Sequence, residues 1–396
     1  MNSRRNFLTL NYNKNTSQSG NNPDLLIYVF QRGAADGLNL VVPYTDTNYY
    51  ANRPTLAIPA PGSGDGSAID LDGFFGINPD LAALLPIYHA QDLAMIHACG
   101  SQDSTHSHFK TQAFVDRGTI DSSFDSGWLA RYANSYSNET ESAFKSVAMN
   151  TAIPASLSGA SSVVALSSIE GFDIIAPESE SDLISYHLLD LFSSNESLGR
   201  AAISTFAAVD IIKEINIGDY PIENDAQYPN SQFGNKLKDL AILIKSDIGI
   251  DTASVDIGGW DTHDSQANTL SQLAQDYANS MAAFYYDMGD RMANISVVTL
   301  TEFGRRLSEN GSGGTDHGKG NVAFIMGGGV NGGQVYRDWP GLSSNDLVGP
   351  GDLAPTTDYR TVLAELLDKR LFFNDYETVF PGFEVPDYLN LFQAKN

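Results

Sequence analysis

The chain has 396 residues, with 48 acidic and 23 basic side chains and a formal net charge of −25 at pH 7. Apolar residues make up 42% of the chain, so it can bury a sizeable core, and its length exceeds the roughly 250–300 residues at which single cores stop growing. The acidic surplus excludes nucleic acid as a partner because phosphates would be repelled. No apolar run in the sequence approaches the roughly 20 residues that span a bilayer, and Cys99 is the single cysteine of the sequence, which excludes a disulfide within the chain.

The amino-terminal residues 3–8 read SRRNFL, which resembles a twin-arginine export signal. The apolar region that normally follows is missing, because residues 11–22 read NYNKNTSQSGNN. We expect residues 1–23 to be a disordered tail or relict leader and residues 24–396 to form one domain, with an insertion or cap at about 140–230. A functional signal predicts a periplasmic protein, whereas the missing apolar region favours a cytoplasmic one.

Short apolar segments rich in strand formers adjoin polar segments along the chain, at residues 25–30, 93–99, 250–259, 295–300 and 322–326. Between them, apolar residues at three- and four-residue spacing predict helices over 79–91, 236–248, 270–288 and 359–371. This alternation predicts an α/β fold with a mainly parallel sheet flanked by helices on both faces. In such sheets ligands bind beyond the carboxyl ends of the strands, where the polar segments lie.

Histidines are the clearest chemical signal in these polar segments. Of seven in the chain, four lie beside predicted strands and next to acids or hydroxyls: His106, His108, His263 and His317. Imidazole and carboxylate together suit Zn²⁺, Mn²⁺ or iron. Asp261 lies two residues before His263, so in an extended segment both side chains point to the same side. Asp316 precedes His317 and is either a ligand or an acceptor that holds a histidine ring.

Two further carboxylates follow predicted strands. Glu302 lies two residues past the strand at 295–300, where a buried carboxylate needs a partner, either a cation or one of Arg305 and Arg306. Asp36 lies in the segment GAADG, where its alternative role is to shape a turn.

The segment THSHF offers two hydroxyl groups, Thr105 and Ser107, between and beside imidazoles. A hydroxyl becomes a nucleophile when a base or a metal removes its proton. The alternative is that either residue caps the helix predicted to begin near residue 107 and to extend to residue 117.

Several segments together resemble the bacterial domain-of-unknown-function family 1501: YVFQRGAADGLNLVVPY, RPTLAI, STHSHFKTQ, GGWDTHDSQ, TEFGRRLSENGSGGTDHGKGN and GGGVNGGQVYRDWPGL. That family is similar to the alkaline phosphatase and sulfatase superfamily, whose members act on phosphate and sulfate esters at one or two metal ions. The resemblance covers roughly residue 24 to the carboxyl terminus. It implies an alkaline phosphatase-like domain with one or two divalent cations as cofactor, from among Zn, Mn, Mg and Ca.

The resemblance also implies roles for individual residues. It implies metal ligands at Asp36, Asp261, His263, Glu302 and His317, and a hydroxyl nucleophile at Ser107, with Thr105 as second choice. Phe303 stands where the superfamily has a metal-binding histidine, so either His108 or His106 replaces that ligand or a single metal binds. Lys319 stands in place of a further histidine and, with Arg32, is a candidate to neutralise an anionic ester.

The function hypothesis is a metal-dependent hydrolase of phosphate or sulfate esters, acting on a small anionic ester or on a sulfated or phosphorylated glycan. One alternative is a non-catalytic accessory protein on the same scaffold with a degenerate metal site, suggested by Phe303. Another is a carbohydrate-active module in which Trp260 and Trp339 stack on sugar rings.

Overall fold

The computed structural model describes residues 23–101, 103, 105–135, 142–172, 187, 191 and 196–395. The twin-arginine-like motif at residues 3–8 and all but the last residue of the predicted tail lie outside this part of the chain. The described part of the predicted insertion at about 140–230 contributes two short strands to the main sheet, β6 (Ser146–Ala148) and β7 (Val163–Ala165).

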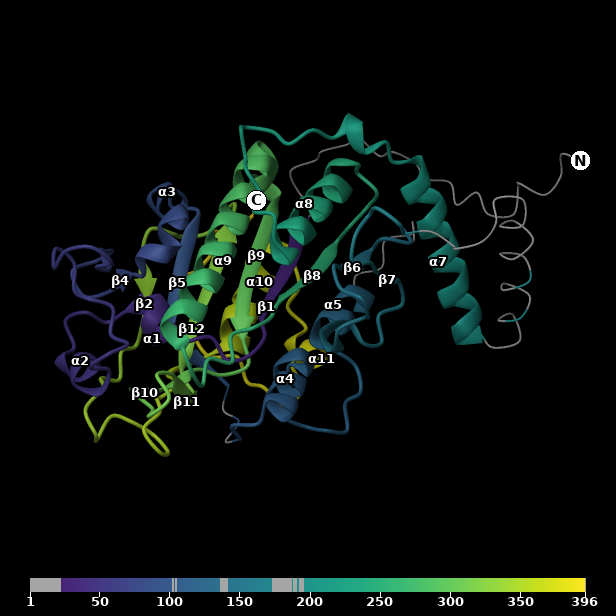
Figure 1. The fold of residues 1–396 in the computed structure, drawn as a ribbon. Coiled ribbons are helices and arrows are strands. Elements are labelled where there is room, and N and C mark those ends of the chain that lie inside the picture. The colour runs from purple at the N-terminus through teal and green to yellow at the C-terminus, as the bar shows by residue number, and fades with distance from the viewer. Residues whose placement is uncertain are drawn as a thin grey trace, which may run out of the picture.

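One large sheet forms the centre of the molecule, with strand order β13-β5-β12-β9-β1-β8-β6-β7 and β14 beside β5 (Figure 1). Its long strands are β1 (Leu25–Gln31), β5 (Leu93–Gly100), β8 (Thr252–Ile257), β9 (Ile295–Thr301) and β12 (Asn321–Gly327). The strands β1, β8, β9, β6 and β7 pair in parallel, as do β13 (Val335–Tyr336) and β14 (Thr357–Asp358) with β5. The mainly parallel sheet predicted from the sequence is thereby confirmed.

Helices cover both faces of this sheet, as its two-sided burial requires. Along β1, Ile27 and Val29 enter the apolar cluster that includes α8 (Gln232–Lys245) and α9 (Gln266–Met288). The alternating residues Leu26, Tyr28 and Phe30 enter a second cluster with α5 (Trp128–Ser135) and α10 (Tyr359–Leu371). Successive side chains of a strand point to opposite faces, so these two clusters are the cores on the two sides of the sheet (Figure 1).

The helix predicted over residues 79–91 is a 3-10 helix, η2 (Pro79–Leu84), followed by a short α3 (Leu85–His89). Asn78 caps η2 by accepting from the backbone N–H of Asp80, and Pro86 at the start of α3 has no N–H to donate. The remaining elements are short or peripheral: α1 (Gly37–Leu40), β2 (Val41–Val42), α2 (Thr47–Asn52), β3 (Ile69–Asp70), β4 (Gly76–Ile77), α4 (His108–Arg117), η3 (Ala155–Leu157), α7 (Glu196–Glu214), η4 (Ile217–Asp219), η5 (Gly289–Asn294), β10 (Arg305–Glu309), β11 (Thr315–His317) and α11 (Tyr376–Val379). Across the described part of the chain, no helix has the length and apolar character needed to cross a membrane.

The direction of β12 decides which loops meet. It runs antiparallel to both β5 and β9, so its amino end lies at the edge of the sheet where β1, β5, β8 and β9 have their carboxyl ends. The loops after those four strands and the segment before β12 therefore share one edge. That segment contains β11, which pairs with β10 in a small two-stranded sheet.

Candidate metal centre

Two loops at this edge cross in close contact. Gly33, after β1, has φ of +120°, and a Cβ atom there would lie 2.5 Å from the backbone nitrogen of Asp261 and 2.9 Å from atoms of Trp260. Only glycine combines this backbone conformation with such a close approach. The glycine thus lets the loop after β1 pack directly beneath Asp261, which follows β8.

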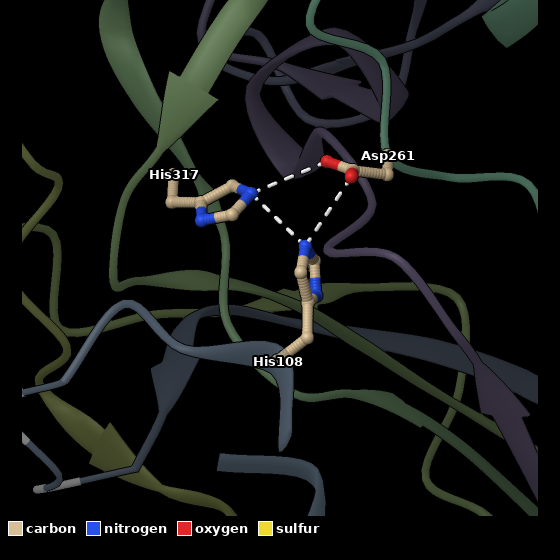
Figure 2. Close-up of side chains that lie close together, drawn as sticks. All are labelled: His108, Asp261 and His317. Carbon is tan, nitrogen blue, oxygen red and sulfur yellow. Dashed lines mark hydrogen bonds and ion pairs between the residues drawn. The ribbon is translucent and has the colours of Figure 1, made fainter. Parts of the chain in front are cut away.

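Three imidazoles and one carboxylate converge above this crossing. The Nε2 atom of His317 lies 3.0 Å from Nε2 of His108, 2.8 Å from Nε2 of His263 and 3.2 Å from Oδ1 of Asp261. His108 Nε2 is 3.5 Å from the other Asp261 oxygen. Figure 2 shows His108, Asp261 and His317 pointing toward one another from separate segments. Single donor atoms of these three residues all lie within 4.8 Å of one another, close enough to hold one metal ion.

Each of the three imidazoles faces an acceptor with its other nitrogen. Nδ1 of His317 lies 2.8 Å from the backbone oxygen of His106, and Nδ1 of His108 lies 2.7 Å from Oε1 of Glu302. Nδ1 of His263 makes a longer contact of 3.4 Å with Asp316. With protons on these Nδ1 atoms, the three Nε2 atoms would present lone pairs to one another, the arrangement found in histidine metal ligands. A cation among them would then offset the repulsion between those lone pairs.

Burial and neighbouring side chains shift the pKa values of the carboxyl and imidazole groups in this region. Burial opposes ionisation of Asp261, but the Arg305 guanidinium, 2.7 Å away, outweighs it and lowers the pKa of the carboxyl to about 2. The hydrogen bond to Glu302 raises the pKa of His108, whereas burial lowers the pKa of His317. The hydrogen bond from Asn310 lowers the pKa of Asp316. Asp261 is therefore ionised and His317 favours its neutral, metal-binding form.

Glu302 lies behind His108, and its partner is neither Arg305 nor Arg306. Its side chain is buried, and Oε1 accepts from the backbone N–H of Gly33 at 2.9 Å and from Gln112 Nε2 at 2.8 Å, besides the contact with His108. Burial opposes its ionisation, but the hydrogen bonds from His108 and Gln112 outweigh this and lower the pKa of its carboxyl. The structure thus places Glu302 as a hydrogen-bond partner of His108, and the replacement of the ligand missing at Phe303 by His108 stays a prediction.

Asp36 lies apart from the converging imidazoles, in an ion pair. Arg53 donates to its two oxygens at 2.6 and 3.0 Å, and Gln266 Nε2 donates to Oδ2 at 2.5 Å. Both side chains of the Asp36–Arg53 pair have no exposed surface. Asp36 is therefore the counter-ion of Arg53 in this structure, and its expected role as a metal ligand stays a prediction. Arg53 also donates to the backbone oxygens of Arg306 and Leu307 in β10.

The hydroxyl candidates precede α4. Thr105 Oγ1 donates to Asp103 Oδ2 at 2.7 Å, and Thr111 donates to the same oxygen at 2.7 Å, so Thr105 is held in a local turn. Ser107 is the residue before the first turn of α4, and its hydroxyl does not cap the helix. His106 Nε2 lies 2.7 Å from Oδ2 of the buried Asp352, so this nitrogen is paired with Asp352.

An aromatic ring packs against the cluster formed by His108, Asp261, His263 and His317, and two cationic side chains were expected near it. The Phe303 ring packs 5.0 Å from the His108 ring and 4.9 Å from the His317 ring, so it forms an apolar floor. Lys319 follows His317 by two residues and is half-buried. Arg32, expected to neutralise an anionic ester, instead contacts Asp256 at 2.6 Å and Asp116 at 3.3 Å.

Sequence reasoning missed two residues of this region, Arg53 and Gln112. Arg53 begins the segment RPTLAI, which carried the family resemblance without an assigned role. Gln112 follows His108 by four residues in the predicted helix, so the helical spacing alone placed both side chains on one face. That spacing was the available signal for a shared contact with Glu302.

The fold and the cluster of His108, Asp261, His263 and His317 together define an α/β protein with a candidate metal site at the carboxyl edge of its sheet. Residues 225–375 match the family described as "Protein of unknown function (DUF1501)", which confirms the resemblance predicted from the motifs. The matched range contains Asp261, His263, Glu302 and His317, and it excludes His108 and Asp36. No curated protein matches the sequence.

Solved structures of ester hydrolases and related proteins are similar to this chain. The alkaline phosphatase from the Antarctic bacterium TAB5 has 9% identity and a TM-score of 0.31, with 80% of this chain and 95% of that chain covered. The phosphonate monoester hydrolase of Agrobacterium radiobacter has 12% identity and a TM-score of 0.40, covering 91% and 78%. The C-terminal periplasmic domain of EcEptC from Escherichia coli, in complex with Zn, has 12% identity and a TM-score of 0.34, covering 78% and 74%. Likeness at this level does not define the activity of this chain.

Proposed function

We propose that this protein is a metal-dependent hydrolase of phosphate or sulfate esters, with one divalent cation held by His108, Asp261, His263 and His317. The observation that carries the proposal is that Nε2 of His317 lies 2.8–3.2 Å from Nε2 of His108, Nε2 of His263 and Oδ1 of Asp261. A non-catalytic accessory protein would not require these side chains to converge. The accessory-protein alternative rests on Phe303, which stands where the superfamily has a metal-binding histidine.

The donor set favours a first-row transition metal. Imidazole nitrogens suit Zn²⁺ or iron, whereas Mg²⁺ and Ca²⁺ prefer sites built from oxygen. One ion rather than two is supported by the other carboxylates, because Arg53 and Gln266 use both oxygens of Asp36, and His108 and Gln112 use Glu302. A bound divalent cation would polarise an ester oxygen and lower the pKa of a water molecule.

The proposed metal site is open to solvent, and neighbouring residues set the charge around it. The side chains of Asp261 and His263 are 47% and 42% exposed, so solvent and a substrate reach this side of the cluster. Arg305 keeps Asp261 ionised, and the acceptors behind the rings hold the imidazoles in place. Lys319 carries no hydrogen bond or ion pair within the described residues through its side chain, and we assign it to neutralise the anionic group of the ester.

Ser107 is the candidate nucleophile of this proposal, and Thr105 is the second choice. Ser107 immediately precedes His108, and its hydroxyl is not used to cap α4. In this scheme the serine oxygen loses its proton and attacks phosphorus or sulfur, and the bond from that atom to the ester oxygen breaks as the ester oxygen takes up a proton. Water then cleaves the new bond to Ser107, which releases the free phosphate or sulfate and restores the serine hydroxyl. Direct attack by water on the ester is the competing route. The Ser107→Ala variant distinguishes the two routes, because only the serine route needs the Ser107 hydroxyl.

The test is hydrolysis of aryl phosphate, phosphate diester and aryl sulfate substrates by the purified chain before and after chelation. We expect activity on at least one substrate class, its loss with a chelator and its return with Zn²⁺, Mn²⁺ or Fe²⁺. Asp261→Asn should abolish it, whereas Asp264→Asn, which changes an exposed acid three residues away, should not. Activity that survives both chelation and Asp261→Asn would remove the cluster from the reaction.

A further inference from the structure

A polar side chain separates Glu302 from the guanidinium of Arg32. These two charged residues directly follow the register pair Gln31–Thr301 on the neighbouring parallel strands β1 and β9. Opposite charges at such adjacent positions attract strongly when they are buried. Arg32 and Glu302 nevertheless form no ion pair with each other, although both are fully described, and each is paired elsewhere.

The amide of Gln112 lies between them and is oriented to match both. Its nitrogen Nε2 donates to Glu302 Oε1 at 2.8 Å, and its oxygen Oε1 accepts from Arg32 Nη1 at 3.4 Å. A carboxylate at this position would repel Glu302, and an ammonium group would repel Arg32. An amide is the side-chain group that presents an acceptor to the guanidinium and a donor to the carboxylate at once.

We propose that Gln112 is a positioning residue of the metal centre, which keeps Glu302 bonded to His108 by holding Arg32 away from it. Gln112 and His108 lie four residues apart on α4, so both side chains reach the same oxygen of Glu302. Arg32 is meanwhile retained by Asp256 and by Asp116. This inference rests on the proposed metal site and adds a determinant of its affinity.

Removing Gln112 opens a route for the guanidinium to reach Glu302. A guanidinium carries a full positive charge and can donate two parallel hydrogen bonds to a carboxylate, so Arg32 would compete with His108 for Glu302. His108 would then lose the acceptor on Nδ1 that orients its ring. Loss of such a partner lowers metal affinity roughly 10- to 100-fold in other metal sites.

The test measures the dissociation constant for Zn²⁺ by chelator competition, and the visible absorption spectrum after loading with Co²⁺. Gln112→Ala should weaken Zn²⁺ binding roughly 10- to 100-fold and alter the Co²⁺ bands, which report ligand geometry. Gln112→Met fills the same space without the amide, keeps Arg32 at a distance and should retain most of the affinity. Lys110→Ala, an exposed residue on the same helix, serves as the matched control and should match the wild type.

Thermal unfolding of each variant shows whether a loss of affinity reflects misfolding. Unchanged Zn²⁺ affinity in Gln112→Ala would overturn the inference, and so would equal losses in Gln112→Ala and Gln112→Met, because separation from Arg32 would then not matter. A folded wild-type chain that binds neither Zn²⁺ nor Co²⁺ would instead overturn the proposed metal site, and the inference with it.

Discussion

Carboxylates near one edge of the sheet have different partners and therefore different roles. Asp261 faces the imidazoles with an exposed side chain, Glu302 is buried behind His108, and Asp36 is buried against Arg53. The sequence places all three in similar positions, one loop beyond a strand. Their partners come from elsewhere in the chain, and the partner decides whether a carboxylate can bind a metal.

Asp36→Asn should destabilise the protein without removing its metal. The substitution leaves the Arg53 guanidinium buried without a counter-charge, and breaking a buried pair in this way costs about 3–5 kcal/mol. Urea unfolding measures the stability, and elemental analysis of the folded protein measures the metal. Loss of metal with unchanged stability would show that Asp36 is a ligand after all.

At the scale of elements, the close crossing of two loops is what sets Asp261 in place. Gly33→Ala should lower both the stability and the metal affinity, because the added Cβ meets backbone atoms of Asp261 and Trp260 at 2.5–2.9 Å. Gly64→Ala is the matched control, since Gly64 has φ of +119° but no atom within 4 Å of an added Cβ. Gly64→Ala therefore places alanine at nearly the same positive φ without the clash. Equal effects of the two substitutions on metal binding would contradict a role for the crossing.

The strand β5 carries a buried histidine that couples stability to pH. Burial lowers the pKa of His97 from 6.5 to about 4, assisted by the charge of Arg337 and opposed by the hydrogen bond to Val41 and the charge of Asp36. The unfolded chain therefore binds more protons than the native one between these values. Above pH 6.5 the neutral His97 ring does not lower the free energy of unfolding. As the pH falls toward 4, the free energy of unfolding decreases by roughly 3 kcal/mol, because only the unfolded chain binds the proton.

The pH dependence is measured by urea unfolding at several pH values for the wild type and for His97→Gln, which keeps a donor and an acceptor but does not titrate. The wild type should lose stability more steeply than the variant as the solution is acidified. Parallel curves for the two proteins would exclude His97 as the source of the dependence.

Sequence patterns predicted the long elements better than the short ones. The apolar runs at 25–30, 93–99 and 295–300 are strands, and 359–371 is a helix. Their type could be predicted because a short apolar run indicates a buried strand and three- and four-residue apolar spacing indicates a helix. The antiparallel direction of β12 is not written in its own residues, yet it brings His317 to the edge where His108 and Asp261 lie. The pairings Asp36–Arg53 and Glu302–His108 join residues 17 and 194 positions apart, so they depend on the assembled chain.

At the scale of the whole molecule, the net charge of −25 makes the binding of an anionic ester dependent on metal. The site region has three carboxylates, those of Asp261, Glu302 and Asp316. Two guanidinium groups pair with them: Arg305 contacts Asp261, and Arg306 contacts Asp316. Calorimetry with inorganic phosphate should detect binding to the metal-loaded protein and much weaker binding to the metal-free protein. Equal affinities in the two forms would contradict this electrostatic argument.

The metal content of the purified chain tests the proposed metal centre most directly. After incubation with Zn²⁺ and removal of free ions, elemental analysis should find close to one ion per chain in the wild type. His317→Ala should bind much less, because His317 makes the shortest contacts to the other members of the cluster, whereas His89→Ala, an exposed histidine outside it, should match the wild type. A folded wild-type chain without stoichiometric metal, or full metal content in His317→Ala, would contradict the assignment of this cluster as a metal centre.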